Sequence, residues 1–67
     1  MILRYCTNRD MNGHRQIFIM NTDTKEYAFQ AWSMCITLGE YILIGYGAMN
    51  RIIDMCKKDG YKWINAI

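Results

Sequence analysis

The sequence has little net charge, no long apolar run and no closely spaced cysteines, and each shortage excludes a class of protein. Eight lysines and arginines oppose six aspartates and glutamates. A protein held to nucleic acid mainly by phosphate contacts usually shows a basic stripe, and the sequence contains none. An acidic mimic of nucleic acid would need a net negative charge, whereas this chain carries a net charge of +2.

Membrane-spanning and secreted proteins have signatures that the sequence also lacks. No stretch approaches the ~18 apolar residues that cross a bilayer. Residues 1–10 lack the basic segment and apolar core of a secretory signal. The cysteines, Cys6, Cys35 and Cys56, are odd in number and far apart, which does not fit a disulfide-stapled secreted domain. We therefore expect a cytoplasmic protein with no membrane partner.

Residues that would carry cofactor or metal chemistry are scarce. Gly45 and Gly47 begin a dinucleotide-binding pattern, but Asn50 stands at the third glycine position and no lysine follows to make a P-loop. The glycine pair therefore indicates a bend between a strand and a helix. The cysteines and His14 have the wrong spacing for a short-loop zinc site. His14 is expected at an exposed hairpin tip, without an acid or nucleophile beside it. We expect no catalytic residue, no cofactor and no metal, and hence a protein that is not an enzyme.

Apolar side chains, by contrast, are abundant and make up 52% of the 67 residues. This composition is inconsistent with intrinsic disorder, so residues 1–67 are expected to form a single small domain. Asn12-Gly13 predicts a two-residue turn with both residues at positive φ. This turn would join strands at 2–10 and 14–20 into a hairpin.

A second reversal is predicted at 21–25, where asparagine, aspartate and threonine side chains can hydrogen-bond to nearby backbone. A strand at 26–31 would follow and complete an antiparallel meander. A helix over 24–38 is the alternative, because Asp23 and Glu26 have the spacing of a capping box. A polar stripe at helical spacing supports that alternative, formed by Glu26, Gln30, Ser33 and Thr37.

The C-terminal half predicts a strand, a helix and a final strand. Residues 40–45 indicate a short buried strand, and 48–59 follow the helical period with one apolar face, formed by Met49, Ile52, Ile53 and Cys56. Gly60 fits the left-handed position that ends many helices, after which Tyr61 can pack back on the last turn. A closing strand is expected at 61–67. The predicted fold class is α+β, an antiparallel β-meander with one helix packed on one sheet face and a C-terminal strand, in two layers.

Two predicted strands are apolar on both faces, which bears directly on function. Ile17 and Ile19 alternate with Phe18 and Met20, and residues 41–44 show the same pattern. A single helix covers one face, so the second must be covered by residues 32–39, by a second copy of the chain or by another protein. An uncovered apolar face or strand edge would be an interaction site. The candidate partner-binding residues are Phe18, Met20, Tyr27, Phe29, Trp32 and Tyr46. We expect a protein partner and a homo-oligomer.

The order of these signals resembles small proteins encoded by phages and mobile elements of low-GC Gram-positive bacteria. The shared plan consists of the Asn12-Gly13 hairpin, the reversal within 17–29, an apolar strand at 40–44, a helix over 48–59 and a closing 59–64. Proteins of this setting include anti-CRISPR inhibitors of host defence. The resemblance implies an inhibitor of a host defence nuclease complex that acts in the host cytoplasm. It brings no catalytic residues with it.

Nucleic-acid binding is the alternative function. Nine aromatic residues are dense for a chain of this size, and aromatic rings on a sheet can stack single-stranded bases. Basic residues interleave with them only towards the C-terminus. The candidate residues for this alternative are Arg51, Lys57, Lys58, Lys62 and Trp63.

Overall fold

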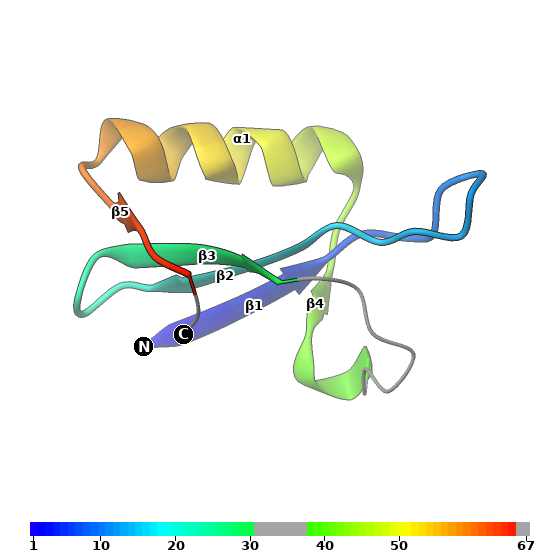
Figure 1. The fold of residues 1–67 in the computed structure, drawn as a ribbon, viewed down its shortest axis with the longest axis horizontal. Helices are drawn as coiled ribbons and strands as arrows, with labels where there is room; N and C mark the ends of the chain where they lie inside the picture. The colour runs from blue at the N-terminus through cyan, green and yellow to red at the C-terminus, as the bar shows by residue number, and fades with distance from the viewer. Residues whose placement is uncertain (31–37, 66–67) are drawn as a thin grey trace.

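A five-stranded mixed sheet with one helix on one face forms the fold (Figure 1). The computed structural model describes residues 1–30 and 38–65. The elements, in chain order, are β1 (Ile2–Cys6), β2 (Ile17–Asn21), β3 (Glu26–Gln30), the 3₁₀ turn η1 (Leu38–Glu40), β4 (Ile42–Leu43), α1 (Tyr46–Lys58) and β5 (Lys62–Trp63). The strand order across the sheet is β4-β1-β2-β3-β5. The predicted α+β class, with one helix packed against a sheet, is confirmed.

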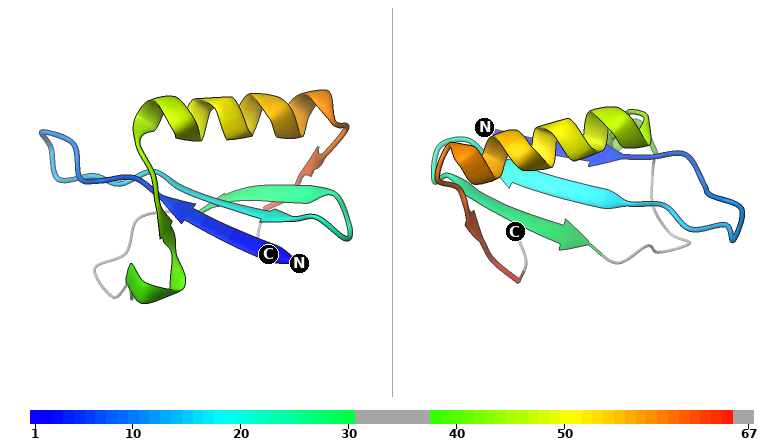
Figure 2. Two further views of the ribbon diagram at one scale, coloured as in Figure 1. Left: turned by 180° about the vertical axis from the view of Figure 1, so that it is seen from behind. Right: turned by 90° about the horizontal axis from the view of Figure 1, so that it is seen from above.

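The centre of the sheet is the predicted meander, and its two edges come from the C-terminal half. β2 pairs antiparallel with β1 and with β3. β4 pairs parallel with β1, and β5 pairs parallel with β3. α1 connects these two edge strands and crosses over the meander, as both views in Figure 2 show. A strand-helix-strand crossover returns the chain in its original direction, which explains the parallel pairings at both edges.

Helix α1 has the apolar face that its sequence predicts. Met49, Ile53 and Cys56 are buried, and Ile52 packs against the same cluster. The helix begins at Tyr46, two residues before the predicted start at residue 48. Gly45 is its N-cap, with φ −76° and ψ 164°, an extended conformation that any residue adopts. The chain thus bends from β4 into α1 at the glycine pair, as expected, but Gly45 does not need the freedom of glycine there.

The end of α1 forms a Schellman motif, which confirms the predicted stop at Gly60. Gly60 has φ +82°, and its N–H donates to the Lys57 carbonyl at 3.3 Å. The Tyr61 N–H donates to the Cys56 carbonyl at 3.0 Å, and Tyr61 packs against the cluster that contains Cys56. These are the two hydrogen bonds that define the motif. It turns the chain directly into β5, where the Lys62 N–H donates to the Lys25 carbonyl at 2.9 Å.

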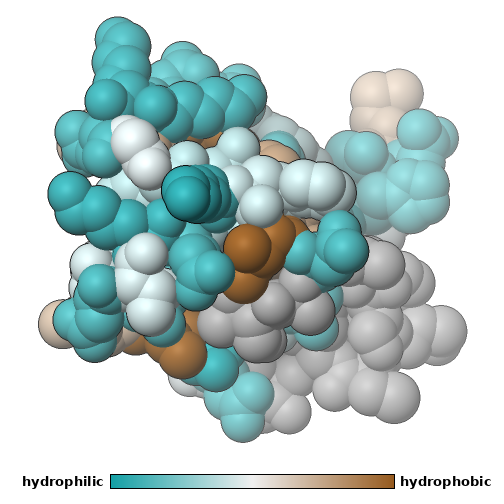
Figure 3. All heavy atoms as spheres, turned by 60° about the vertical axis from the view of Figure 1, so that its left-hand side comes forward, coloured by the Kyte–Doolittle hydropathy of each residue, from teal (hydrophilic) through white to brown (hydrophobic). Residues whose placement is uncertain are grey.

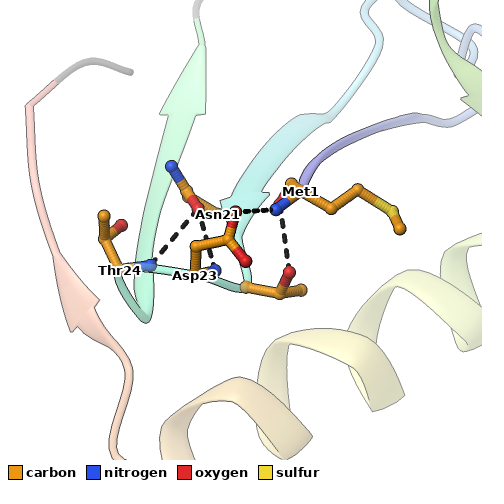
Figure 4. A network of polar contacts seen from close by, with 5 residues as sticks. Met1, Asn21, Asp23 and Thr24 are labelled. Carbon is orange, nitrogen blue, oxygen red and sulfur yellow. Dashed lines mark hydrogen bonds and ion pairs between the residues drawn. The ribbon is translucent and has the colours of Figure 1, made fainter.

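The β2–β3 connection is a reversal at the predicted place. The Asn21 side-chain oxygen accepts hydrogen bonds from the Asp23 and Thr24 N–H groups, at 3.0 and 3.3 Å (Figure 4). Lys25 takes a left-handed conformation with φ 55°. The amino group of Met1 forms an ion pair with the Asp23 carboxylate, which ties the start of β1 to this turn.

The strand reading of residues 26–30 is confirmed, and the alternative helix is wrong over that range, because β3 occupies it. The remainder of the alternative helix mostly falls on residues 31–37, which lie outside the described residues. The predicted buried strand at 40–45 is wrong in two respects. β4 contains only Ile42 and Leu43, and both are exposed because β4 lies at the sheet edge with a strand on one side only.

Both faces of β2 are buried within one chain. Phe18 lies on the α1 side with Tyr27, Met49 and the rest of the larger core cluster. Ile17 and Ile19 alternate to the other side, where they are 1% and 6% exposed. There they form a second cluster with Cys6, and the partly buried Tyr41 packs against it. The predicted alternation is confirmed, and these residues need no second copy or outside protein to cover them.

Candidate functional site

The connection between β1 and β2 projects from the body of the molecule. Residues 7–16, called the arm below, extend beyond the sheet in Figures 1 and 2. At its tip, the Gly13 N–H donates to the Asp10 carbonyl at 3.0 Å, and the Asp10 N–H donates to the His14 carbonyl at 2.8 Å. Gly13 has φ +79°, whereas Asn12 does not have a positive φ. The predicted two-residue turn is therefore wrong, and the loop has three residues, 11–13, ending in a left-handed glycine.

The Asp10 side chain organises the tip from inside the loop. Its Oδ1 accepts hydrogen bonds from the Asn12 N–H at 2.8 Å and from the His14 N–H at 2.9 Å. The hydrogen bond from the His14 backbone holds the pKa of the Asp10 carboxyl below its ordinary value. The Asp10 charge is thus directed towards the arm's own backbone.

Hydrogen bonds at the base of the arm join its two sides to each other and join the arm to α1. Thr7 is fully buried; its N–H donates to the Gln16 carbonyl at 3.1 Å, and its hydroxyl accepts from the Gln16 N–H at 2.9 Å. Arg15 donates from Nη1 to the Thr7 carbonyl at 3.1 Å. Tyr46, at the start of α1, donates from its hydroxyl to the Asn8 carbonyl at 3.1 Å. The first two contacts join the two sides of the arm at its base, and the third joins the arm to α1.

A cleft of about 430 Å³ lies where the arm, the end of β3 and the start of α1 meet. Phe29 and Tyr46 contribute aromatic rings that are 43% and 42% exposed, and the buried Ile17 adds apolar wall. The polar lining residues are Asp10, His14, Arg15, Gln16 and Gln30. Gln30 is itself oriented, because its Oε1 accepts a hydrogen bond from the Tyr41 hydroxyl at 3.0 Å. The cleft thus combines an apolar interior with a rim of hydrogen-bonding groups.

The structure places the candidate partner-binding residues that it describes in two different environments, the cleft and the core beneath α1. Phe29 and Tyr46 meet at the cleft. Phe18 and Tyr27 are buried beneath α1 and Met20 is half-buried against the same cluster, because helix α1 covers the sheet face to which these side chains point. These three therefore do not form an exposed apolar sheet face in this structure, which is a correction to that expectation. Trp32 lies outside the described residues.

The candidate nucleic-acid residues are all exposed but lie away from the cleft lining. Arg51, Lys57 and Lys58 are on α1, the last two in its final turn, and Lys62 and Trp63 form β5. The side of the molecule with the β2–β3 turn and the C-terminal end of α1 is mainly hydrophilic, with small hydrophobic areas (Figure 3). The described residues on this side carry positive charge at Lys57, Lys58 and Lys62.

Other features of the described residues offer less to a ligand. A smaller pocket of about 150 Å³ lies between α1 and β1, lined mainly by apolar side chains such as Leu3, Tyr5 and Met20. Cys6 and Cys56 are buried free thiols, and burial raises the pKa of Cys56, with a smaller contribution from the charge of Asp59. Within residues 1–30 and 38–65, no group of three metal-ligating side chains converges. No helix in the described part is long and apolar enough to cross a membrane.

Sequence reasoning missed Arg15, Gln16 and Gln30 as parts of the site. His14 is exposed, as expected, and it also lines the cleft. One local signal was available: Asn12-Gly13 predicted a turn, which placed residues 14–16 on one side of a hairpin. The approach of Tyr46 to Asn8, across 38 positions of sequence, had no local signal.

Comparisons of the chain with protein-family models, with curated proteins and with solved structures find no match. The site is therefore interpreted from its own geometry.

Proposed function

We propose that the protein is a non-enzymatic interaction module that binds a protein partner at the cleft and along the arm. One observation carries the proposal: two half-exposed aromatic rings from distant elements, Phe29 and Tyr46, line one cleft beside a projecting arm. Met11 is fully exposed at the tip of that arm. Scattered apolar side chains on a surface are ordinary, but aromatic residues grouped around a recess are typical of binding hot spots.

Binding accounts for the cleft better than catalysis does. The described lining residues include no serine, threonine, cysteine or lysine that could act as a nucleophile. The Asp10 carboxylate accepts backbone N–H groups of the loop, and no hydrogen bond between it and the His14 ring is found among the described residues. A general base needs a positioned partner of that kind. The open cleft and its anchored rim are suited to holding a segment of another protein.

The resemblance to phage and mobile-element proteins supplies the first partner class to assay, a host defence nuclease complex. Inhibition would then result from occupation of the partner's surface by the arm and the cleft. The earlier expectation of a homo-oligomer depended on an open second sheet face. That face is buried around Ile17 and Ile19 within one chain, so light scattering in solution is the direct test of oligomeric state.

Three variants test the proposed surface by affinity purification of the partner from host extract. If a nuclease complex is captured, binding of the same variants to the purified complex is then measured. Phe29→Ala and Tyr46→Ala each remove one ring of the cleft, and Met11→Ser changes the arm tip without touching the core. Trp63→Ala is the matched control, because it removes an exposed aromatic side chain from β5, away from the cleft lining. We expect the cleft variants to lose the partner and Trp63→Ala to retain it. Equal recovery with all variants would refute the proposed surface.

Nucleic-acid binding is a second candidate, favoured by the exposure of Lys57, Lys58, Lys62 and Trp63 at adjacent elements. A filter-binding titration over a salt series tests it, since phosphate contacts produce a steep dependence on salt. In this assay Trp63→Ala is a test variant and no longer a control. It should weaken nucleic-acid binding, because bases could no longer stack on the Trp63 ring.

A further inference from the structure

Arg15 stands out at the cleft as a cation without an acidic partner in the described structure. All six acidic side chains of the sequence lie within residues 1–30 and 38–65. The structure records an ion pair of Asp23 with the Met1 amino group and none that involves Arg15. The recorded hydrogen bond of the Arg15 guanidinium is from Nη1 to the Thr7 carbonyl. A guanidinium has five N–H donors, so donors remain for a ligand.

The acidic residue in the same lining, Asp10, forms no ion pair with Arg15 in the described structure. Asp10 directs its Oδ1 to the Asn12 and His14 N–H groups. This oxygen is therefore satisfied by the loop backbone, while Arg15 remains beside the apolar wall formed by Ile17 and Phe29. Arginine is the side chain that best matches the planar, two-pronged geometry of a carboxylate.

We propose that the cleft binds an acidic peptide segment, in which a glutamate or aspartate pairs with Arg15 and an adjacent apolar side chain contacts Phe29 and Tyr46. This inference rests on the proposed protein-binding function and specifies the chemistry of the partner. The Arg15 hydrogen bond to Thr7 holds the guanidinium at the rim before the ligand arrives. Such preorganisation reduces the entropy lost on binding.

The half-buried position of Arg15 makes this pairing stronger than one on open surface. A guanidinium beside apolar walls is less hydrated than one surrounded by water, which strengthens its attraction for a carboxylate. Gln16 and Gln30 lie in the same lining and can hydrogen-bond to the peptide backbone of the bound segment. The result is a rim that recognises charge and main chain, around an interior that accepts an apolar side chain.

The test is an NMR titration of the intact protein with three capped pentapeptides that share a central phenylalanine. The probes are acetyl-Gly-Glu-Phe-Glu-Gly-amide, the version with glutamine in place of glutamate, and the version with lysine. We expect the glutamate peptide to shift the amide signals of residues 14–17 and 29–30. The glutamine peptide should bind about tenfold more weakly, as expected for loss of a charge-assisted hydrogen bond, and the lysine peptide should not bind.

Two further measurements assign the effect to Arg15. Arg15→Gln should weaken the glutamate peptide about tenfold, and Arg51→Gln, on the exposed surface of α1, should leave it unchanged. Because Arg15→Gln also removes the contact with Thr7, the wild-type protein is titrated at two salt concentrations, where higher salt should weaken the glutamate peptide alone. Equal binding of the glutamate and glutamine peptides would overturn the acidic preference and leave the proposed function intact. Absence of cleft shifts with every peptide would overturn this inference, while the affinity purification with Phe29→Ala judges the proposed function separately.

Discussion

Replacing Gly60 with alanine isolates the energetic value of one backbone conformation. Gly60 has φ +82°, and a Cβ built there meets no atom within 4 Å. The cost of Gly60→Ala is therefore the left-handed conformation itself, about 1–2 kcal/mol for a residue with a Cβ. Gly39→Ala is the matched control, since its Cβ also meets nothing within 4 Å and its φ is not positive. Both substitutions restrict the unfolded chain equally, so that contribution cancels in the comparison.

The two variants are compared by urea unfolding and by thermal unfolding followed by circular dichroism. In a domain of this size, each kcal/mol changes Tm by about 4–8 °C, so Gly60→Ala should melt about 5–15 °C below Gly39→Ala. Gly60→Asn should recover part of the loss, because asparagine tolerates the left-handed region. Equal stability of Gly60→Ala and Gly39→Ala would refute the Schellman motif as the connection between α1 and β5.

Three other predictions concern the arm and the buried thiols. Thr7→Val should lower the unfolding free energy by about 1–3 kcal/mol in urea titrations, because the Gln16 N–H loses its acceptor, whereas Thr7→Ser should retain that hydrogen bond. The folded pKa of Asp10 is depressed, so its contribution to stability is present above about pH 4 and is lost as the pH falls through the folded pKa. The Asn12 amide signal in NMR should therefore move on acidification in the wild type but not in Asp10→Asn. Cys56 is buried with a raised pKa, so mass spectrometry after thiol alkylation should find it modified only at the rate of unfolding, and rapid labelling of the native protein would contradict its position.

The parts of the fold that sequence reasoning predicted are those set by short-range physics. The apolar spacing of Met49, Ile53 and Cys56 fixed the buried face of α1, and Gly60 marked its end. The alternation of side chains along β2 correctly assigned Ile17 and Phe18 to opposite faces of the sheet. In each case the deciding interactions lie within a few residues along the chain, where the helical period, the strand period and turn chemistry act.

The edges of the sheet were not predictable in the same way. β4 is a run of apolar residues, which suggested a buried strand, but its position at an edge exposes Ile42 and Leu43. Whether a strand lies at the edge or in the centre of a sheet is decided by the strands with which it pairs. The β1–β4 pairing joins residues that are far apart in the sequence, such as Tyr5 and Ile42. A periodic pattern reports how many faces of a strand are apolar, but it does not report how many neighbours the strand has.

The same distinction explains why the candidate site lies at one end of the sheet. Reasoning from faces alone placed the interaction surface on the side of β2 that carries Phe18 and Met20, yet α1 covers that side. Ile17 and Ile19, on the other side, are also buried within one chain. An apolar face can be covered by the chain's own segments, because burial of apolar area is non-directional. The arm is different: its stem extends past β3, whose last residue, Gln30, pairs with Ile17. The pairing of β1 with β2 ends at the same residue, Ile17, and α1 begins nearby with Tyr46. The cleft thus lies where the paired strands end, and its lining comes from the arm, from the end of β3 and from the start of α1.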